Sequence, residues 1–252
     1  MRRRPLPTLA CALTLAHLAA GCDGGGEEGA PAGSGPPAAA AAGIAVIVEG
    51  VEVPARLVDP FLPYLRSFRP HEAEAALKRH ILESHAIPLA RALHRWGREY
   101  AQVRALAAER LEALRAGRLE MGELARRQAA AGNGGRVPAG AGRPLERTRG
   151  ILPVAVGRAL FATRPGGFTD PVRTHLGWHL FQVLSTRNDL VRDLDRVRFV
   201  EALFVPGGRE QIETRDELEA IEKGSVQVVD PAYRRVVSIY HQAPGPGEKS
   251  HD

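Results

Sequence analysis

The hydrophobic side chains change their spacing partway along the chain, and this change constrains the fold more than any other feature. Across residues 71–117 the apolar residues recur at helical steps. Pro88 interrupts this run and must begin a new helix or bend the old one, and Gly117 ends it. Across residues 178–183 the side chains instead alternate between two faces, as on a strand. Together the two periods predict an α+β fold: a helical N-terminal arm, then an antiparallel sheet with flanking helices.

Shorter patterns predict the remaining elements. Residues 44–53 are rich in β-branched side chains around Glu49-Gly50, which is typical of a strand or hairpin with a tight turn. Helices are expected at 121–128, at 154–161 and after a capping box at Thr214 and Glu217, a loop at 127–147, and strands at 197–205, 225–229 and 236–240.

The N-terminus has the arrangement of an export signal. Three arginines at positions 2–4 precede an apolar stretch, 9–20, that is too short to span a membrane. Leu18 to Cys22 resembles the lipobox of bacterial lipoproteins, in which the cysteine is lipidated and becomes the new N-terminus. We therefore expect a lipoprotein of the bacterial cell envelope, facing the periplasm and held at the membrane through Cys22. The alternative is a free cysteine after an ordinary cleaved signal.

The charge balance argues against a nucleic-acid partner. The formal net charge is +5, but residues 1–21 hold three arginines and no acid, so the remainder has 31 basic and 29 acidic side chains. No basic stripe with interleaved aromatic residues is left. Cys11 leaves with the signal, and a body without a free thiol suits an oxidising compartment. Residues 24–43 contain seven Gly, seven Ala and three Pro, which predicts a flexible tether.

Common catalytic and metal-binding patterns are missing. His80 and His85 flank Glu83, but a five-residue step does not place two imidazoles on one helical face. Both are therefore expected to be solvated helix residues. The glycines at 132–142 lack the flanking strand and helix of a nucleotide-binding loop, and there is no G-x-S-x-G sequence. We predict no metal and no cofactor.

The most specific pattern lies at residues 159–183, with the sequence ALFATRPGGFTDPVRTHLGWHLFQV. It resembles the C-terminal half of the parvulin-type (PpiC-like) peptidyl-prolyl cis-trans isomerase domain. The residues in register are Phe161, Ala162, Pro165, Gly166, Thr169, Pro171, Val172, Thr174, Gly177, His179 and Val183. Residues 106–125 resemble the first helices of that family. Residues 44–100 are similar to the helical N-terminal region of SurA-like periplasmic chaperones.

The resemblance implies an enzyme that isomerises X-Pro bonds in unfolded or extended proline-containing polypeptides, without a cofactor or covalent step. Rotation about that bond faces a barrier of about 18–20 kcal/mol. Catalysis needs an apolar pocket for the ring and polar groups that favour the twisted amide. Carried over by position, the resemblance implies that His179 and Thr174 are catalytic and that Leu152, Val156 and Phe168 bind substrate.

The chain departs from the family pattern at two positions. The family has a first histidine on a strand before the long helix, where residues 96–103 offer none, and an acid or thiol that is missing from Gln128 to Ala131. Val197 to Val205 is a candidate to fill the strand position from the C-terminal side, with Glu201 in place of the histidine. Three hypotheses stay open: an isomerase and folding chaperone, a catalytically weak or inactive peptide-binding chaperone module, and a structural envelope lipoprotein.

The expected domains follow in chain order. They are a signal peptide at 1–21, the lipidated cysteine and tether at 22–43, a helical chaperone-like region at 44–100, a parvulin-like domain at 101–187, and a C-terminal α/β extension with a disordered tail at 188–252.

Overall fold

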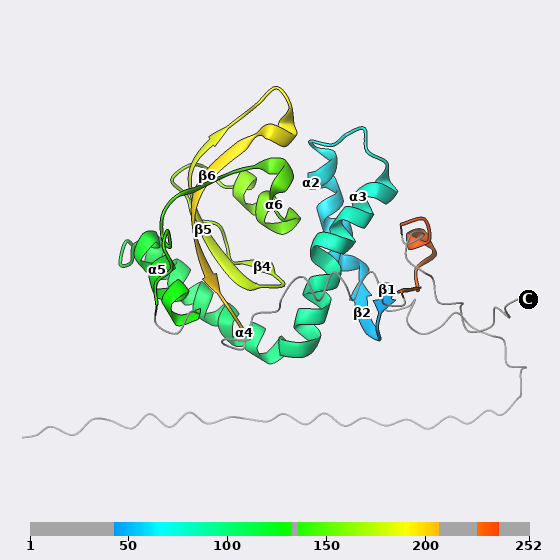
Figure 1. Ribbon diagram of the computed structural model, residues 1–252, viewed down its shortest axis with the longest axis horizontal. Coiled ribbons are helices and arrows are strands. Elements are labelled where there is room, and N and C mark those ends of the chain that lie inside the picture. Colours follow the sequence, from blue (N-terminus) through cyan, green and yellow to red (C-terminus); the bar gives the residue numbers. More distant parts are fainter. Residues whose placement is uncertain (1–42, 133–135, 207–225, 237–252) are drawn as a thin grey trace, which may run out of the picture. The chain divides into compact units, whose positions relative to one another are not determined.

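The computed structural model describes residues 43–132, 136–206 and 226–236 of the 252-residue chain (Figure 1). These residues form two antiparallel sheets and several helices, which confirms the predicted α+β fold. One sheet has the strand order β2-β1-β7 and the other β3-β6-β5-β4. In the described ranges, no helix has both the length and the apolar character needed to cross a membrane.

The elements have the following bounds. The strands are β1 (Ile44–Val48), β2 (Val51–Pro54), β3 (Leu145–Thr148), β4 (Val172–Thr174), β5 (Gly177–Arg187), β6 (Arg196–Phe204) and β7 (Val226–Val228). The α-helices are α2 (Leu62–Arg66), α3 (Glu74–Ile81), α4 (Ile87–Arg115), α5 (Met121–Gly132) and α6 (Val154–Ala162). A π-helical turn spans Leu82–Ala86, and 3-10 turns span Ala55–Leu57, Asp59–Phe61, Arg149–Ile151, Arg192–Leu194 and Pro231–Tyr233.

The three-stranded sheet joins the N-terminal hairpin to a C-terminal strand. Glu49 and Gly50 both have positive φ, 49° and 81°, as a two-residue hairpin turn requires, so the predicted turn is confirmed. On its other edge β1 pairs with β7, which confirms a strand within 225–229. Val236 lies in a turn. The rest of the strand expected at 236–240 and the capping box at Thr214 lie outside the described residues.

Helix α4 contributes to two different hydrophobic clusters. It follows α3 directly through the π-helical turn Leu82–Ala86, with Pro88 in its first turn, and it kinks at Trp96, where φ is −130° and ψ is 34°. Before the kink, Leu89 packs in the same cluster as the N-terminal hairpin and α3. After the kink, Leu111 packs with α5 and the four-stranded sheet. Because of the kink, the two halves of α4 pack in different hydrophobic clusters, one with the N-terminal hairpin and α3 and the other with α5.

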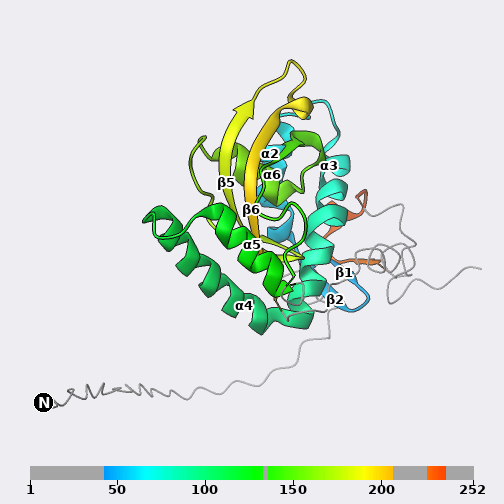
Figure 2. The same cartoon turned by 60° about the vertical axis from the view of Figure 1, so that its left-hand side comes forward.

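The four-stranded sheet is covered on both faces, with α6 on one and α5 on the other (Figures 1 and 2). Phe181 and Val183 of β5 pack in the cluster that contains α6, whereas Leu180 packs in the cluster of α4 and α5. The expected alternation along β5 is thus confirmed. The face that bears Phe181 also bears His179 and carries the candidate site.

One feature of this sheet differs from the expectation. β3 begins within the segment 127–147, which was expected to be a loop, and ends one residue after it, because Leu145-Glu-Arg-Thr is mostly polar and becomes a strand by pairing with β6. β6 agrees with the strand expected at 197–205, and it pairs with both β3 and β5. Pairing with a segment far along the chain decides the conformation of β3, and the local sequence does not show it.

Candidate functional site

A buried histidine on β5 forms the centre of the candidate site. His179 is only 4% exposed. Its Nε2 lies 2.6 Å from the Thr174 hydroxyl oxygen, and its Nδ1 lies 2.6 Å from Oε1 of Glu201. Its ring also stacks on Phe181, with the ring centres 5.6 Å apart and the planes 9° from parallel. Three neighbours therefore hold the imidazole in one orientation.

Strand register brings these groups together. The β4–β5 hairpin places Thr174 opposite Gly177, two residues before His179. β6 pairs Glu201 with Phe181, so its carboxylate lies diagonal to His179 on the same face. Gly177 has a φ of 138°, and a Cβ there would lie 2.2 Å from the Phe204 carbonyl oxygen. Only glycine allows β6 to approach β5 this closely at the start of the strand.

Helix α4 fixes the turn that carries the threonine. The Tyr100 hydroxyl, on a residue only 2% exposed, lies 3.0 Å from the carbonyl oxygen of Thr174 and 2.6 Å from that of His175. In return, Trp178 Nε1 donates a hydrogen bond of 2.9 Å to the Tyr100 carbonyl oxygen. The site is thus tied to the part of α4 that follows the kink.

The hydrogen bonds around the imidazole form a consistent chain. An ionised Glu201 carboxylate only accepts, so His179 Nδ1 donates to it. The Leu176 backbone N–H donates to the Thr174 oxygen at 3.2 Å, which leaves the hydroxyl proton free to point at Nε2. When the imidazole is neutral, these partners select the tautomer protonated on Nδ1.

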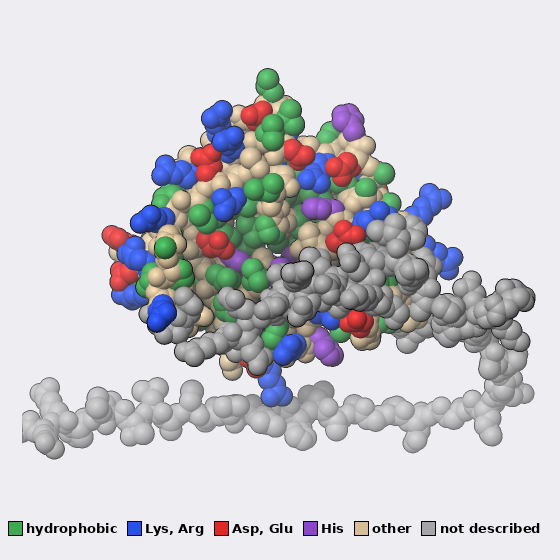
Figure 3. Space-filling model, in the orientation of Figure 1, with side chains coloured by type: hydrophobic (Ala, Val, Ile, Leu, Met, Phe, Trp, Pro, Cys, Tyr) green, Lys and Arg blue, Asp and Glu red, His purple; other side chains and the backbone are tan. Residues whose placement is uncertain are grey.

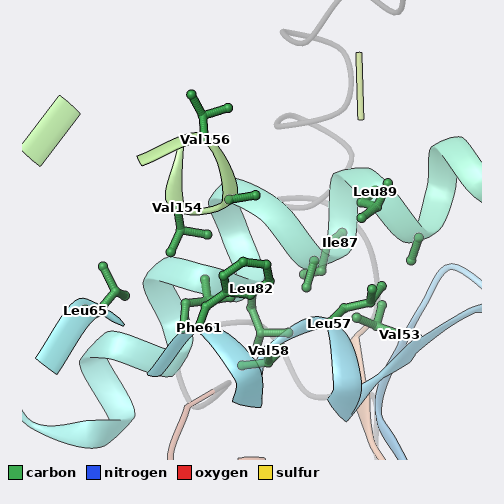
Figure 4. Packing of buried hydrophobic residues seen from close by; sticks show 14 of the residues in the cluster. Val53, Leu57, Val58, Phe61, Leu65, Leu82, Ile87, Leu89, Val154 and Val156 are labelled. Carbon is green, nitrogen blue, oxygen red and sulfur yellow. The ribbon is translucent and has the colours of Figure 1, made fainter. Parts of the chain in front are cut away.

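A hollow of about 250 Å³ lies beside this chain. Its walls are largely apolar, and its volume is below the roughly 300–1,000 Å³ typical of pockets for drug-sized ligands. Val154 of α6 points into the core toward Phe61 and Leu82, whereas Val156 points the other way (Figure 4) and lines the hollow. Hydrophobic side chains gather near the centre of the face shown in Figure 3, with histidine side chains next to them. The apolar wall residues include Leu145, Leu152, Pro153, Val156, Phe181 and Phe199.

Two further histidines line the hollow. His85 was expected to be solvated, but it is only 3% exposed and contacts Phe61 edge-on at 4.7 Å, so that expectation is wrong. Burial lowers the pKa of His85 to about 4. Burial, and then the nearby His179, also lower the pKa of His175, whose buried Nε2 has no hydrogen-bond partner among the described residues. The apolar residues Leu82 and Leu89, three before and four after His85, were a usable sign that it faces the core.

The structure brings together most of the residues singled out from the sequence. His179, Thr174, Leu152 and Val156 all line the hollow. Phe168 does not, because it packs in the cluster of α4 and α5, on the other face of the sheet. Glu201, which the sequence offered as a candidate in place of the first histidine, also lies at the centre of the site, with Oε1 2.6 Å from Nδ1 of His179. Cys22 lies outside the described residues.

The arrangement is suited to non-covalent chemistry. Hydroxyl, imidazole and carboxylate follow one another as in acyl-transfer triads. Here, however, Thr174 is only 4% exposed and its oxygen accepts the Leu176 N–H, so the hydroxyl is held inside the fold instead of being presented to a substrate. No group of three or more His, Cys, Asp or Glu side chains suited to a metal ion occurs in the described part of the chain. What remains is an apolar hollow bordered by imidazoles.

The fold and this site define a small α+β domain that presents an apolar hollow beside a fixed polar chain. Comparison with family models agrees, since residues 97–198 match the family described as PPIC-type PPIASE domain. Over residues 97–198 the chain is therefore similar to a parvulin-type peptidyl-prolyl isomerase domain. The match begins directly after the kink at Trp96 and ends within β6. Searches of curated proteins and of solved structures found no match.

Proposed function

We propose that this chain is a peptidyl-prolyl cis-trans isomerase and folding chaperone for exported proteins, acting without a cofactor or covalent intermediate. The observation that carries the proposal is the hydrogen-bonded chain of Thr174, His179 and Glu201 beside the apolar hollow. The parvulin-type domain supports the reaction class and implies proline-containing polypeptides as substrates.

In this proposal the hollow binds the twisted amide better than either planar form. A proline ring packs against Leu152 and Val156, which removes water from the rotating bond. His179 and Thr174 supply fixed dipoles that stabilise the twisted state, and Glu201 keeps the imidazole in its tautomer. Each tenfold gain in rate needs about 1.4 kcal/mol of such differential binding. No bond is made or broken.

A protease-coupled isomerisation assay on short proline peptides tests this function. We expect His179→Ala to reduce the catalysed rate about tenfold or more, because buried hydrogen bonds to charged groups are worth about 1.5–3 kcal/mol. His94→Ala, an exposed histidine of α4, is the matched control and should keep the rate. Because His179 is buried, His179→Gln and a thermal unfolding curve for each variant separate lost catalysis from lost folding. A wild-type rate no higher than background would refute the isomerase function.

The second hypothesis, a peptide-binding module with little catalysis, has a specific observation in its favour. A carboxylate, that of Glu201, and not a second histidine is hydrogen-bonded to Nδ1 of His179, and no acid or thiol occurs from Gln128 to Ala131. An aggregation assay with an unfolded client discriminates between the two functions. Suppressed aggregation without isomerase activity would support the binding module, and neither activity would favour the structural envelope lipoprotein.

We further propose export and lipid anchoring. The support is the lipobox-like Leu18–Cys22 after a basic and apolar N-terminus. The proposal places the lipidated cysteine and tether at 22–43, a SurA-like arm at 44–100, and the parvulin-like domain and C-terminal extension beyond. Mass spectrometry of the N-terminus should show acylated Cys22 in the membrane fraction, and Cys22→Ala should release the protein from it. An unmodified cysteine would contradict the anchor.

A further inference from the structure

A second and larger depression lies next to the hollow. It has a volume of about 990 Å³ and is lined by α4, α6, β4 and the turns that follow β2. His85 lines both this groove and the hollow, so the two share a wall. We call the larger depression the arginine groove, because five arginines line it: Arg56, Arg104, Arg115, Arg158 and Arg173.

The positive charge of the arginine groove is largely uncompensated. Asp170 is the one acid that lines it, and this carboxylate is paired with Arg115 at 2.8 Å. Within the described residues, no carboxylate oxygen lies within 4 Å of a guanidinium nitrogen of the other four arginines. Arg173 is half-buried, and burial followed by the charges of Arg56 and Arg104 lowers its pKa. Like charges gathered in one groove raise the free energy of the unliganded protein, and a bound anion relieves this cost.

Aromatic rings hold the guanidinium groups in place. Those of Arg104 and Arg173 lie 5.6 and 5.8 Å from the centre of the Trp178 ring, and that of Arg158 lies 4.4 Å from the centre of Phe61. The Trp178 ring is itself fixed by its hydrogen bond to the Tyr100 carbonyl. Arginines ordered in this way lose less side-chain entropy when they pair with carboxylates.

The remaining walls favour a polypeptide over a nucleic acid. Leu57, Leu89 and Leu93 line the groove. Leu57 and Leu89 are buried beneath its surface, whereas Leu93 is half-buried and presents an aliphatic side chain that suits the apolar residues of a peptide. Binding of single strands normally relies on aromatic faces that stack on bases. Here Trp178 and Phe61 already carry guanidinium groups, and Tyr100 is only 2% exposed. Phe168 is the one other aromatic ring among the lining residues, so the groove has no row of free faces for successive bases.

We propose that the arginine groove binds an extended, acidic segment of polypeptide, with carboxylates paired to Arg56, Arg104 and Arg173 and apolar side chains against the half-buried Leu93. The segment belongs to a client protein, so this inference rests on the proposed function and names a class of substrate for it. A client held in the groove stays close to the hollow, which raises the effective concentration of its prolines there.

Fluorescence anisotropy on the full-length protein tests the proposal. The probe is a fluorescein-labelled, proline-free peptide of glutamate, leucine and serine, and the control peptide has glutamine at each glutamate. We expect the glutamate peptide to bind about tenfold more tightly at low ionic strength, with the difference shrinking as salt is added. The double variant Arg56→Gln with Arg104→Gln should lose most of this preference, since both side chains are exposed and their replacement leaves the core intact.

The matched control is Arg187→Gln with Arg198→Gln, which removes the same charge from exposed positions outside the groove. We expect it to change the affinity less than about twofold. Equal binding of the two peptides, an equal loss in the control variant, or tighter binding of a single-stranded oligonucleotide would each overturn the proposal. Because the peptide lacks proline, binding and isomerisation are measured separately. Isomerase activity without a preference for the glutamate peptide would support the proposed function and overturn the role of the arginine groove. A preference for the glutamate peptide without isomerase activity would support the groove and overturn the isomerase function.

Discussion

Replacing Asp195 tests how the two walls of the candidate site are held together. Its carboxylate, on a side chain only 4% exposed, lies 2.9 Å from Nη2 of Arg149 and accepts the backbone N–H of Asp189 at 2.8 Å. Arg149 starts the 3-10 turn that leads to Leu152, and Asp195 directly precedes β6, which carries Glu201. The ion pair therefore connects the apolar wall of the hollow to the strand that orients His179.

The expected cost follows from burial. The Arg149 side chain is 14% exposed, and its guanidinium lies 3.9 Å from the centre of the Phe161 ring. Asp195→Ala leaves this charge buried without its partner, and such losses cost about 3–5 kcal/mol. With a urea dependence of about 2 kcal/mol per molar, the midpoint of unfolding should fall by about 1.5–2.5 M.

Urea unfolding followed by circular dichroism measures this change. Asp189→Ala is the matched control: an exposed aspartate in the same loop, whose loss should cost less than about 0.5–1 kcal/mol. Adding Arg149→Met to Asp195→Ala should cost no more than Asp195→Ala alone, because it removes the unpaired charge. A midpoint for Asp195→Ala that matches the Asp189→Ala control would refute the reasoning.

Two further predictions concern stability. Gly177→Ala should lower the free energy of unfolding by about 3 kcal/mol or more, because the new Cβ meets the Phe204 carbonyl and the positive φ is strained, and urea unfolding measures this. Between pH 6.5 and about 4, His85 binds a proton in the unfolded chain but not in the folded protein. The free energy of unfolding should therefore decrease as the pH is lowered through this window. The total is about 3 kcal/mol, and His85→Leu should flatten this part of the pH profile, read as urea midpoints.

Each of these predictions has its own control. Gly166→Ala also places alanine at a positive φ, 84°, but its Cβ meets nothing within 4 Å, so it isolates the strain from the clash. Equal losses at Gly177 and Gly166 would contradict the close approach of β6. For the histidine, His94→Leu at an exposed position should leave the pH profile unchanged. If the pH profile of His85→Leu is as steep as that of the wild type, groups other than His85 cause the loss of stability.

Local sequence predicted the elements with strong periodicity or fixed turn chemistry. The Glu49-Gly50 turn, the interruption of the helix next to Pro88 and the alternation along β5 depend on residues close in the chain, so their patterns are visible without a structure. The same holds for the resemblance around Gly177 and His179, since these two residues sit on one hairpin. β3 and the burial of His85 were missed, because contacts with distant segments determine both.

The sequence by itself determined that His179 lies on a strand and faces the same side as Phe181. Period-two alternation allows no other outcome once the strand forms. Only the tertiary structure decided that Glu201, 22 positions later, bonds to its imidazole. That contact depends on the register between β5 and β6, and Gly177 permits this register by leaving room for the Phe204 carbonyl. The arginine groove likewise forms only when residues from β2 to β5 fold against one another, because side chains this far apart in the chain meet through packing and not through any local pattern.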